Sequence, residues 1–206
     1  MRVSPPPRPH GRLWAEDRRR QILAVAARLL DERGVDGLRI PDVAQAAGVT
    51  RPVIYRHFPN RQAILMDLLE ETGSALAERL EGLAASGLND VAKLMPDLFE
   101  GLCDEIEAQG AGVWKLLNSA GPDPEVEAVA QSVRDRLVAP WYARVAAVTG
   151  TSGANAVAIT NIIHAIVPPL ITLWSAGALS RVEAVAHLTR AVGAILDAYS
   201  RRSEPN

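Results

Sequence analysis

The chain has 206 residues, of which 48% are hydrophobic and 22% are charged, a composition that excludes the intrinsically disordered class of proteins. Only 4% of the residues are aromatic, which favours helices over sheets. Its single cysteine, Cys103, excludes an intramolecular disulfide and the usual structural zinc sites, so we expect a cytoplasmic protein with neither a metal nor a cofactor. Residues 1–60 carry eleven arginines against six acidic residues, whereas residues 61–206 carry eleven basic and eighteen acidic residues, a division typical of a protein that meets a polyanion with one end.

Residues 1–16 are predicted to be a flexible arm, because proline and arginine dominate the segment SPPPRPHG. Arg8 and Arg12 are placed to enter a DNA minor groove, although disorder is the simpler interpretation of a proline-rich arm. The arm has no apolar stretch of signal-peptide length, so we do not expect export.

Three helices are predicted over residues 17–62. The first begins at Asp17, and its apolar residues recur at helical spacing until Gly34 stops it. The second begins with Pro41, whose fixed φ suits a first helical position. Thr50 is an N-cap for the third helix, which ends near residue 58 because a proline follows.

The rest of the chain, residues 63–206, is predicted to be a bundle of five to six helices. Asn60 caps a long fourth helix, and further helical segments cover residues 89–108, 111–119, 123–149, 153–177 and 180–202. No useful stretch alternates as a strand does, so the fold class is all-α with about nine helices. The adjacent Pro168 and Pro169 are expected to kink or split the helix of residues 153–177 near Ala165.

The segment IPDVAQAAGVTRPVIYRHF, residues 40–58, has the pattern of a helix, a glycine turn and a second helix. Small Ala44 and Ala47 allow the helices to cross closely, and Gly48 can adopt the positive φ of a tight turn. Three apolar side chains can fill the angle between the helices: Val43, Val49 and Ile54. The side chains left exposed on the second helix are Arg51, Pro52, Tyr55 and Arg56. Such a helix fits the major groove of DNA. Chance alone could produce the basic N-terminal end of the chain, but together with this helix the positive charge indicates a DNA-binding end.

Residues 18–70 resemble the DNA-binding domain of the tetracycline-repressor (TetR) family. The resemblance is carried by Val43-Ala44, by Ala47-Gly48-Val49-Thr50, by Ile54-Tyr55-Arg56-His57-Phe58, and by Asn60-Arg61 before an apolar helix. It implies a helix-turn-helix DNA-binding domain over residues 17–62 and a ligand-binding and dimerisation domain over residues 63–206.

The resemblance also implies a role for each residue of the reading surface. Thr50 would cap the third helix and touch a phosphate, while Arg51 and Pro52 would face base edges. Tyr55 and His57, with Arg56 beside them, would hold the DNA backbone, and Arg61 would reach a phosphate. Two positions depart from the family pattern, since Pro52 stands where glycine is frequent and Arg39 stands where serine or threonine usually caps the second helix, although Arg39 can contact phosphate itself. Tyr55 and Phe58 could instead be core aromatics only, and His57 a cap at the helix end.

By the same resemblance the protein is a sequence-specific transcriptional regulator, a repressor released from a palindromic operator by a small lipophilic ligand. The last two helices, about 153–177 and 180–202, would pair with their copies in a homodimer. Independently of the family, two reading helices about 34 Å apart are needed to read a palindrome selectively. A constitutive DNA-binding regulator without a ligand is the alternative, whereas an enzyme is disfavoured because no phosphate loop, zinc-protease or serine-hydrolase motif occurs.

Residues 154–179 are apolar enough to be mistaken for a membrane span, but Asn155, Asn161, His164 and the two prolines favour a buried helix and no membrane. The candidate ligand-binding residues are Met95, Phe99, Leu102, Cys103, Trp114, Leu117, Trp141, Asn161, His164 and Trp174. Asn161 and His164, three residues apart on one helix, are candidates to orient a ligand. The alternative for each residue of this set is ordinary core packing.

Overall fold

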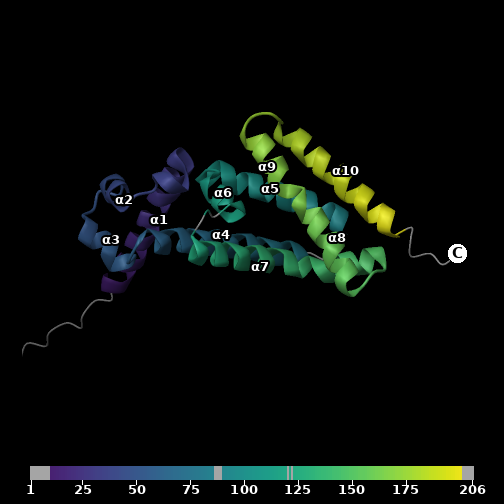
Figure 1. Cartoon of the computed structure of the whole chain (residues 1–206), viewed down its shortest axis with the longest axis horizontal. Coiled ribbons are helices and arrows are strands. Elements are labelled where there is room, and N and C mark those ends of the chain that lie inside the picture. Colours follow the sequence, from purple (N-terminus) through teal and green to yellow (C-terminus); the bar gives the residue numbers. More distant parts are fainter. Residues whose placement is uncertain (1–9, 86–89, 120, 122, 201–206) are drawn as a thin grey trace, which may run out of the picture.

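The computed structural model describes residues 10–85, 90–119, 121 and 123–200, and within these ranges it contains helices and no strand (Figure 1). The helices are α1 (His10–Gly37), α2 (Ile40–Ala46), α3 (Arg51–His57), α4 (Arg61–Ala85), α5 (Val91–Gln109), α6 (Gly112–Asn118), α7 (Pro124–Thr149), α8 (Gly153–Ala165), α9 (Val167–Ser175) and α10 (Arg181–Ser200). The predicted all-α fold is confirmed.

One more helix is present than expected, because the segment predicted as residues 153–177 divides at Ile166 into α8 and α9. Pro168 and Pro169 lie in the first turn of α9, where the N–H groups that prolines lack would have no helical partner in any case. The two prolines therefore split the helix.

Helix α1 begins earlier than predicted. It starts at His10 rather than Asp17, so residues 10–16 are helical and do not belong to a flexible arm. Pro9 directly before the helix is compatible with a helix start, and no further proline interrupts the segment. Arg8 lies outside the described residues. Gly34, with φ 69°, breaks the helical geometry of α1 where the sequence predicts a stop.

Two buried clusters organise the chain. The first joins α1–α3 (the head) to the start of α4, to α6 and to the first half of α7. The second lies among α5, the end of α7, and α8–α10. Together with α6, these helices form what we call the body. Helices α4 and α7 run side by side, so α4 connects the head to the body along its length (Figure 1). Trp114 of α6 packs against both clusters.

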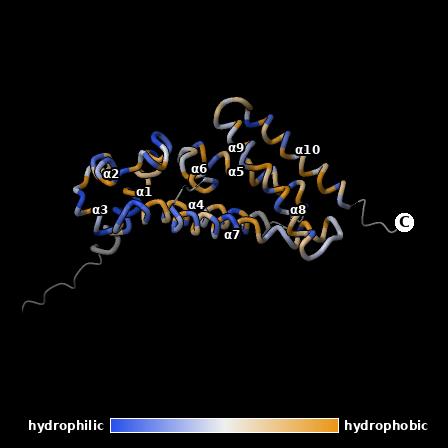
Figure 2. Tube along the Cα trace, viewed as in Figure 1, coloured by the Kyte–Doolittle hydropathy of each residue, from blue (hydrophilic) through white to orange (hydrophobic). Residues whose placement is uncertain are grey.

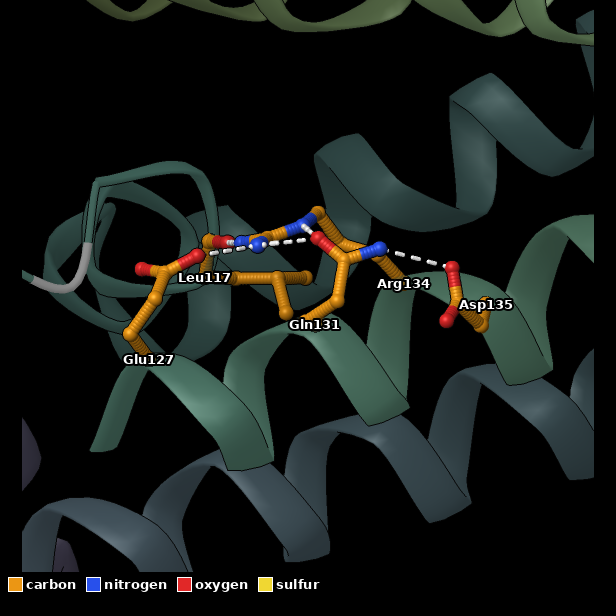
Figure 3. Close-up of polar contacts among 5 residues, drawn as sticks. All are labelled: Leu117, Glu127, Gln131, Arg134 and Asp135. Carbon is orange, nitrogen blue, oxygen red and sulfur yellow. Dashed lines mark hydrogen bonds and ion pairs between the residues drawn. The ribbon is translucent and has the colours of Figure 1, made fainter. Parts of the chain in front are cut away.

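Helix α6 is held from two sides. At its first residue, a Cβ added to Gly112 would lie 2.5 Å from the amide nitrogen of Asp31 in α1, so only glycine permits this approach of main chain to main chain. At its other end, Arg134 of α7 donates a hydrogen bond to the carbonyl of Leu117 and also contacts Glu127 and Gln131 (Figure 3). A cation at this end complements the helix dipole, so α6 is held between α1 and α7.

The segment Gly153–Ser175 is long and apolar enough to cross a membrane by length and composition, yet only 28% of its most apolar window is buried within the chain. The sequence predicted a buried helix for this segment, whereas the structure buries it on one side only. Ile159, Ile163 and Ile171 point into the body core, whereas Val157, Ile162 and Leu173 are exposed. Figure 2 shows few hydrophilic residues along α8 and α9.

Candidate DNA-reading surface and ligand cavity

The turn between α2 and α3 has the geometry that its sequence predicts. Gly48 has φ 64°, and the amide of Val49 donates to the carbonyl of Ala44 at 3.0 Å. Val43 and Ile54 are fully buried, which fixes the angle between the two helices and docks them on α1.

Helix α3 presents one side to solvent. Ile54 is its buried residue, while Arg51, Pro52, Tyr55 and Arg56 are exposed. Tyr55 is 54% exposed and is therefore no core aromatic, whereas Phe58 is fully buried under the guanidinium of Arg19. Thr50 occupies the N-cap position, but its hydroxyl makes no capping hydrogen bond. A basic, aromatic-bearing helix face rests on a rigid core.

The two flanking arginines have different surroundings. Arg39 is exposed at the N-cap of α2 and makes no capping bond there. Arg61 is half-buried, and its Nη1 donates to the carbonyl of Val35 at 3.1 Å, just after the kink in α1. Arg61 thus holds the α1–α2 connection, a structural role that the sequence did not indicate.

A hollow of about 710 Å³ opens beside α3. It is lined by Thr50, Arg56 and His57 from the helix-turn-helix and by Trp14 and Arg18 from α1. Trp14 is 68% exposed, which is unusual for so large an apolar side chain.

Burial and the positive charges of Arg56, Arg19 and Arg18 lower the pKa of His57, so it is uncharged at neutral pH. The sequence predicted that the first helix begins at Asp17 rather than at His10, so Trp14 was assigned to the arm, and neither Trp14 nor Arg18 was singled out. Their spacing of four residues was the available signal.

The body contains an apolar cavity of about 100 Å³. Six of the ten candidate ligand residues line it: Met95, Phe99, Leu102, Trp114, Trp141 and His164. The remaining wall residues are Leu76, Arg79, Leu80, Leu98, Leu137 and Val167. The cavity therefore lies between α4, α5, α6, α7 and the α8–α9 break.

The other four candidates lie elsewhere. Leu117 belongs to the buried cluster of the head, and Cys103 is fully buried in the body core, where burial raises the pKa of its thiol to about 12. Trp174 packs on the body core without lining the cavity. Asn161 is exposed on the outer side of α8, so it does not join His164 at the cavity. Periodicity places both residues on one half of the helix, but only the packing of α8 decides which of them turns inward.

Two residues that line this cavity carry buried polar atoms without a partner in the described ranges. Nε1 of Trp141 and Nε2 of His164 have no hydrogen-bond partner among the described residues, and their rings meet edge to face with centroids 5.8 Å apart. Burial lowers the pKa of His164 to about 4, so the imidazole is neutral at pH 7. An unpartnered buried polar group costs about 1–3 kcal/mol, which marks this pair as the polar feature of the cavity.

Comparison with known proteins places the head in a family. Residues 22–68 match the sequence pattern of the family described as "Bacterial regulatory proteins, tetR family". This part of the chain belongs to that family. Over 120 residues it is 32% identical to the HTH-type transcriptional regulator EthR of Mycolicibacterium smegmatis, covering 56% of this chain and 49% of that protein. Over 70 residues it is 41% identical to TtgR of Pseudomonas putida, covering 32% and 33%. The chain thus spans about half or less of the curated relatives it matches.

Solved structures share the fold of this chain. A putative transcriptional regulator from Pseudomonas aeruginosa aligns over 92% of this chain and 95% of its own, with a TM-score of 0.73 and 15% identity. FadR from Bacillus subtilis, solved in complex with stearoyl-CoA, aligns over 84% and 96%, with a TM-score of 0.68 and 17% identity. At such identities the likeness establishes the fold.

The family match and the cavity lie in different parts of the chain. The match ends at residue 68 inside α4, whereas every residue lining the cavity lies beyond it. No group of three or more His, Cys, Asp or Glu within the described ranges is placed to hold a metal ion. The polar pair of Trp141 and His164 is therefore a feature of this chain's own structure.

Proposed function

We propose that this protein is a DNA-binding transcriptional regulator that reads a palindromic operator in the cytoplasm as a homodimer and is released from it by a small ligand. The observation that carries the proposal is the exposed side of α3, where Arg51, Pro52, Tyr55 and Arg56 project from a helix anchored by buried Ile54. The curated relatives, such as EthR, are named transcriptional regulators, which supports regulation rather than catalysis.

On this surface Arg51 and Pro52 stand at the start of α3, the end that reaches base edges in a major groove. Arginine donates two hydrogen bonds to guanine, and the proline ring offers an apolar contact to a thymine methyl. Thr50, Tyr55, Arg56 and His57 flank the helix and would contact the phosphates, with Arg39 at the start of α2. Trp14 and Arg18 extend this backbone contact along the hollow beside α3.

The exposed face of α8 and α9 supports a homodimer. Val157, Ile162 and Leu173 lie on it, and neither segment carries an Asp, Glu, Lys or Arg. An uncharged apolar face of this length is typical of an interface between permanent partners. Pairing with the same face of a second copy, with α10 alongside, would cover it and produce the two-fold symmetry that a palindrome requires.

Helices α4 and α6 offer the path from ligand to DNA. Trp114 lines the cavity and also packs against the head cluster, and Gly112 at the start of the same short helix touches α1. Each arrangement of α6 would be coupled to one position of the head. A ligand that binds only one of these arrangements would therefore shift the population of molecules toward the corresponding position of the head.

The test is fluorescence anisotropy with intergenic DNA from beside the gene. We expect specific binding that Arg51→Ala or Tyr55→Ala weakens by about tenfold or more. Arg28→Ala is the matched control, because Arg28 is exposed on α1 but shares a hollow with Leu68 and Ala108, away from α3. Absence of binding at low salt, or equal affinities for all four proteins, would overturn the proposal.

A further inference from the structure

We infer that the cavity of the body takes a compact, uncharged molecule with a single hydrogen-bonding oxygen on an otherwise apolar frame. This inference names the ligand class for the proposed function and rests on it for the cavity's role as the effector site. Its basis is the pair of side chains Trp141 and His164, which line one cavity and whose buried nitrogens, Nε1 and Nε2, have no partner in the described part of the chain.

A single ligand oxygen that meets both nitrogens would satisfy them. The indole N–H of Trp141 can only donate, so the ligand atom that meets it must accept. Neutral His164 accepts at Nε2 in one tautomer and donates in the other, and its ring lies edge to face with the indole. A hydroxyl accepts from Trp141 and donates to His164, while a carbonyl oxygen accepts from both.

The charges at the wall argue against an ionised ligand. Arg79 is the one cation among the residues that line the cavity, and its guanidinium faces the carboxylate of Asp104 at 3.6 Å. Its side chain is 47% exposed, which places its charge at the mouth. A carboxylate inside would lose its hydration without gaining a free cation.

The volume limits the size of the ligand. An apolar cavity of 150 Å³ holds a benzene molecule, so the smaller volume of 100 Å³ found here encloses at most one small ring or a short branched chain, and any further atoms of the ligand would lie toward the mouth at Arg79. Leu80, Met95 and Phe99 would contact the apolar part of the ligand.

The probes are p-cresol, p-xylene and 4-methylbenzoate, which share one frame and differ in the group presented to Trp141 and His164. Titration calorimetry on the full chain without DNA measures each dissociation constant. We expect p-cresol to bind about tenfold or more tightly than p-xylene, and 4-methylbenzoate to bind more weakly than p-cresol. Trp141→Phe, which removes the N–H and keeps a ring, should reduce the preference for p-cresol over p-xylene to about threefold or less while p-xylene still binds. Trp174→Phe is the matched control, because Trp174 packs on the same core outside the cavity.

Several results would overturn the inference. These are p-xylene binding as tightly as p-cresol, 4-methylbenzoate binding most tightly, an unchanged preference in Trp141→Phe, or no binding of any probe by a protein that binds its operator. Failure of the proposed function is distinguishable from failure of this inference. A protein that binds p-cresol with this preference but binds no DNA would support the ligand class and contradict the proposed function as a regulator.

Discussion

Gly112 lies directly against the main chain of Asp31, so that an added Cβ would fall 2.5 Å from the Asp31 nitrogen and 2.7 Å from its Cα. The contact joins the first residue of α6 to α1, the helix on which the reading head is built. Two residues further along, Trp114 lines the cavity. A helix of seven residues therefore touches both the ligand site and the head.

Gly112→Ala should destabilise the fold and alter the head position, because main-chain atoms of α1 cannot move aside as a flexible side chain can. We expect a loss of about 1–3 kcal/mol in the free energy of unfolding, measured with urea, and weaker operator binding. Gly82→Ala is the control, since an added Cβ meets nothing within 4 Å there and alanine suits a helix better than glycine. Equal stability of the two variants would contradict the role assigned to Gly112.

Arg18→Gln and Trp14→Ala should weaken DNA binding by similar factors on all sequences, because both residues line the hollow beside α3 rather than its leading end. For Arg18→Gln, the slope of log K against log salt should fall by about one unit, as for one lost phosphate contact. Anisotropy titrations over a series of salt concentrations on operator and unrelated DNA measure this. Loss confined to the operator would show base reading instead.

His164 should make the protein less stable in mild acid. Its pKa is about 4 in the folded chain against an ordinary value of 6.5, so as pH falls below 6.5 the unfolded chain binds a proton that the folded chain does not. The free energy of unfolding should fall by roughly 2 kcal/mol from pH 7 to pH 5 on this account, and level off below pH 4. His164→Gln should remove that part of the decline, whereas His187→Gln, at an exposed position of α10, should not. Parallel stability curves for wild type and His164→Gln would refute the assignment.

Ile162→Asp should convert the proposed dimer into a monomer, because Ile162 is 48% exposed in the middle of the apolar face of α8 and α9. A charge buried there without a partner would cost several kcal/mol in the assembly and little in the single chain. Sedimentation measures the mass. Val148→Asp, at a similarly exposed valine of α7, should leave the dimer intact. A wild-type monomer at micromolar concentration would refute the interface.

Local chemistry made the head predictable. Gly48 and Pro41 act through their own backbones and Asn60 through its side chain, so the turn, the helix start and the cap follow from residue type; the amide of Ala63 indeed donates to Oδ1 of Asn60 at 2.8 Å. The start of α1 was missed because the proline-rich run stops at Pro9, and the residues after it carry no strong helix signal.

The body was predictable as helices, whereas its cavity was predictable only in part, with six of the ten candidates lining it. Leu117, Cys103 and Asn161 have the composition of pocket residues, yet they lie in the head cluster, in the body core and on the surface. A helix of uniformly apolar residues has no sequence signal that distinguishes its inner from its outer side.

By itself, the sequence determined the all-α fold, the helix-turn-helix and the residues that its third helix exposes, because turn and cap chemistry act over a few residues. Only the tertiary structure decided that Arg61 holds the chain at Val35, that Trp14 and Arg18 line the hollow beside α3, and that Trp141 and His164 share one cavity. These relationships join residues far apart in the chain, and they depend on how whole helices rotate and pack against one another.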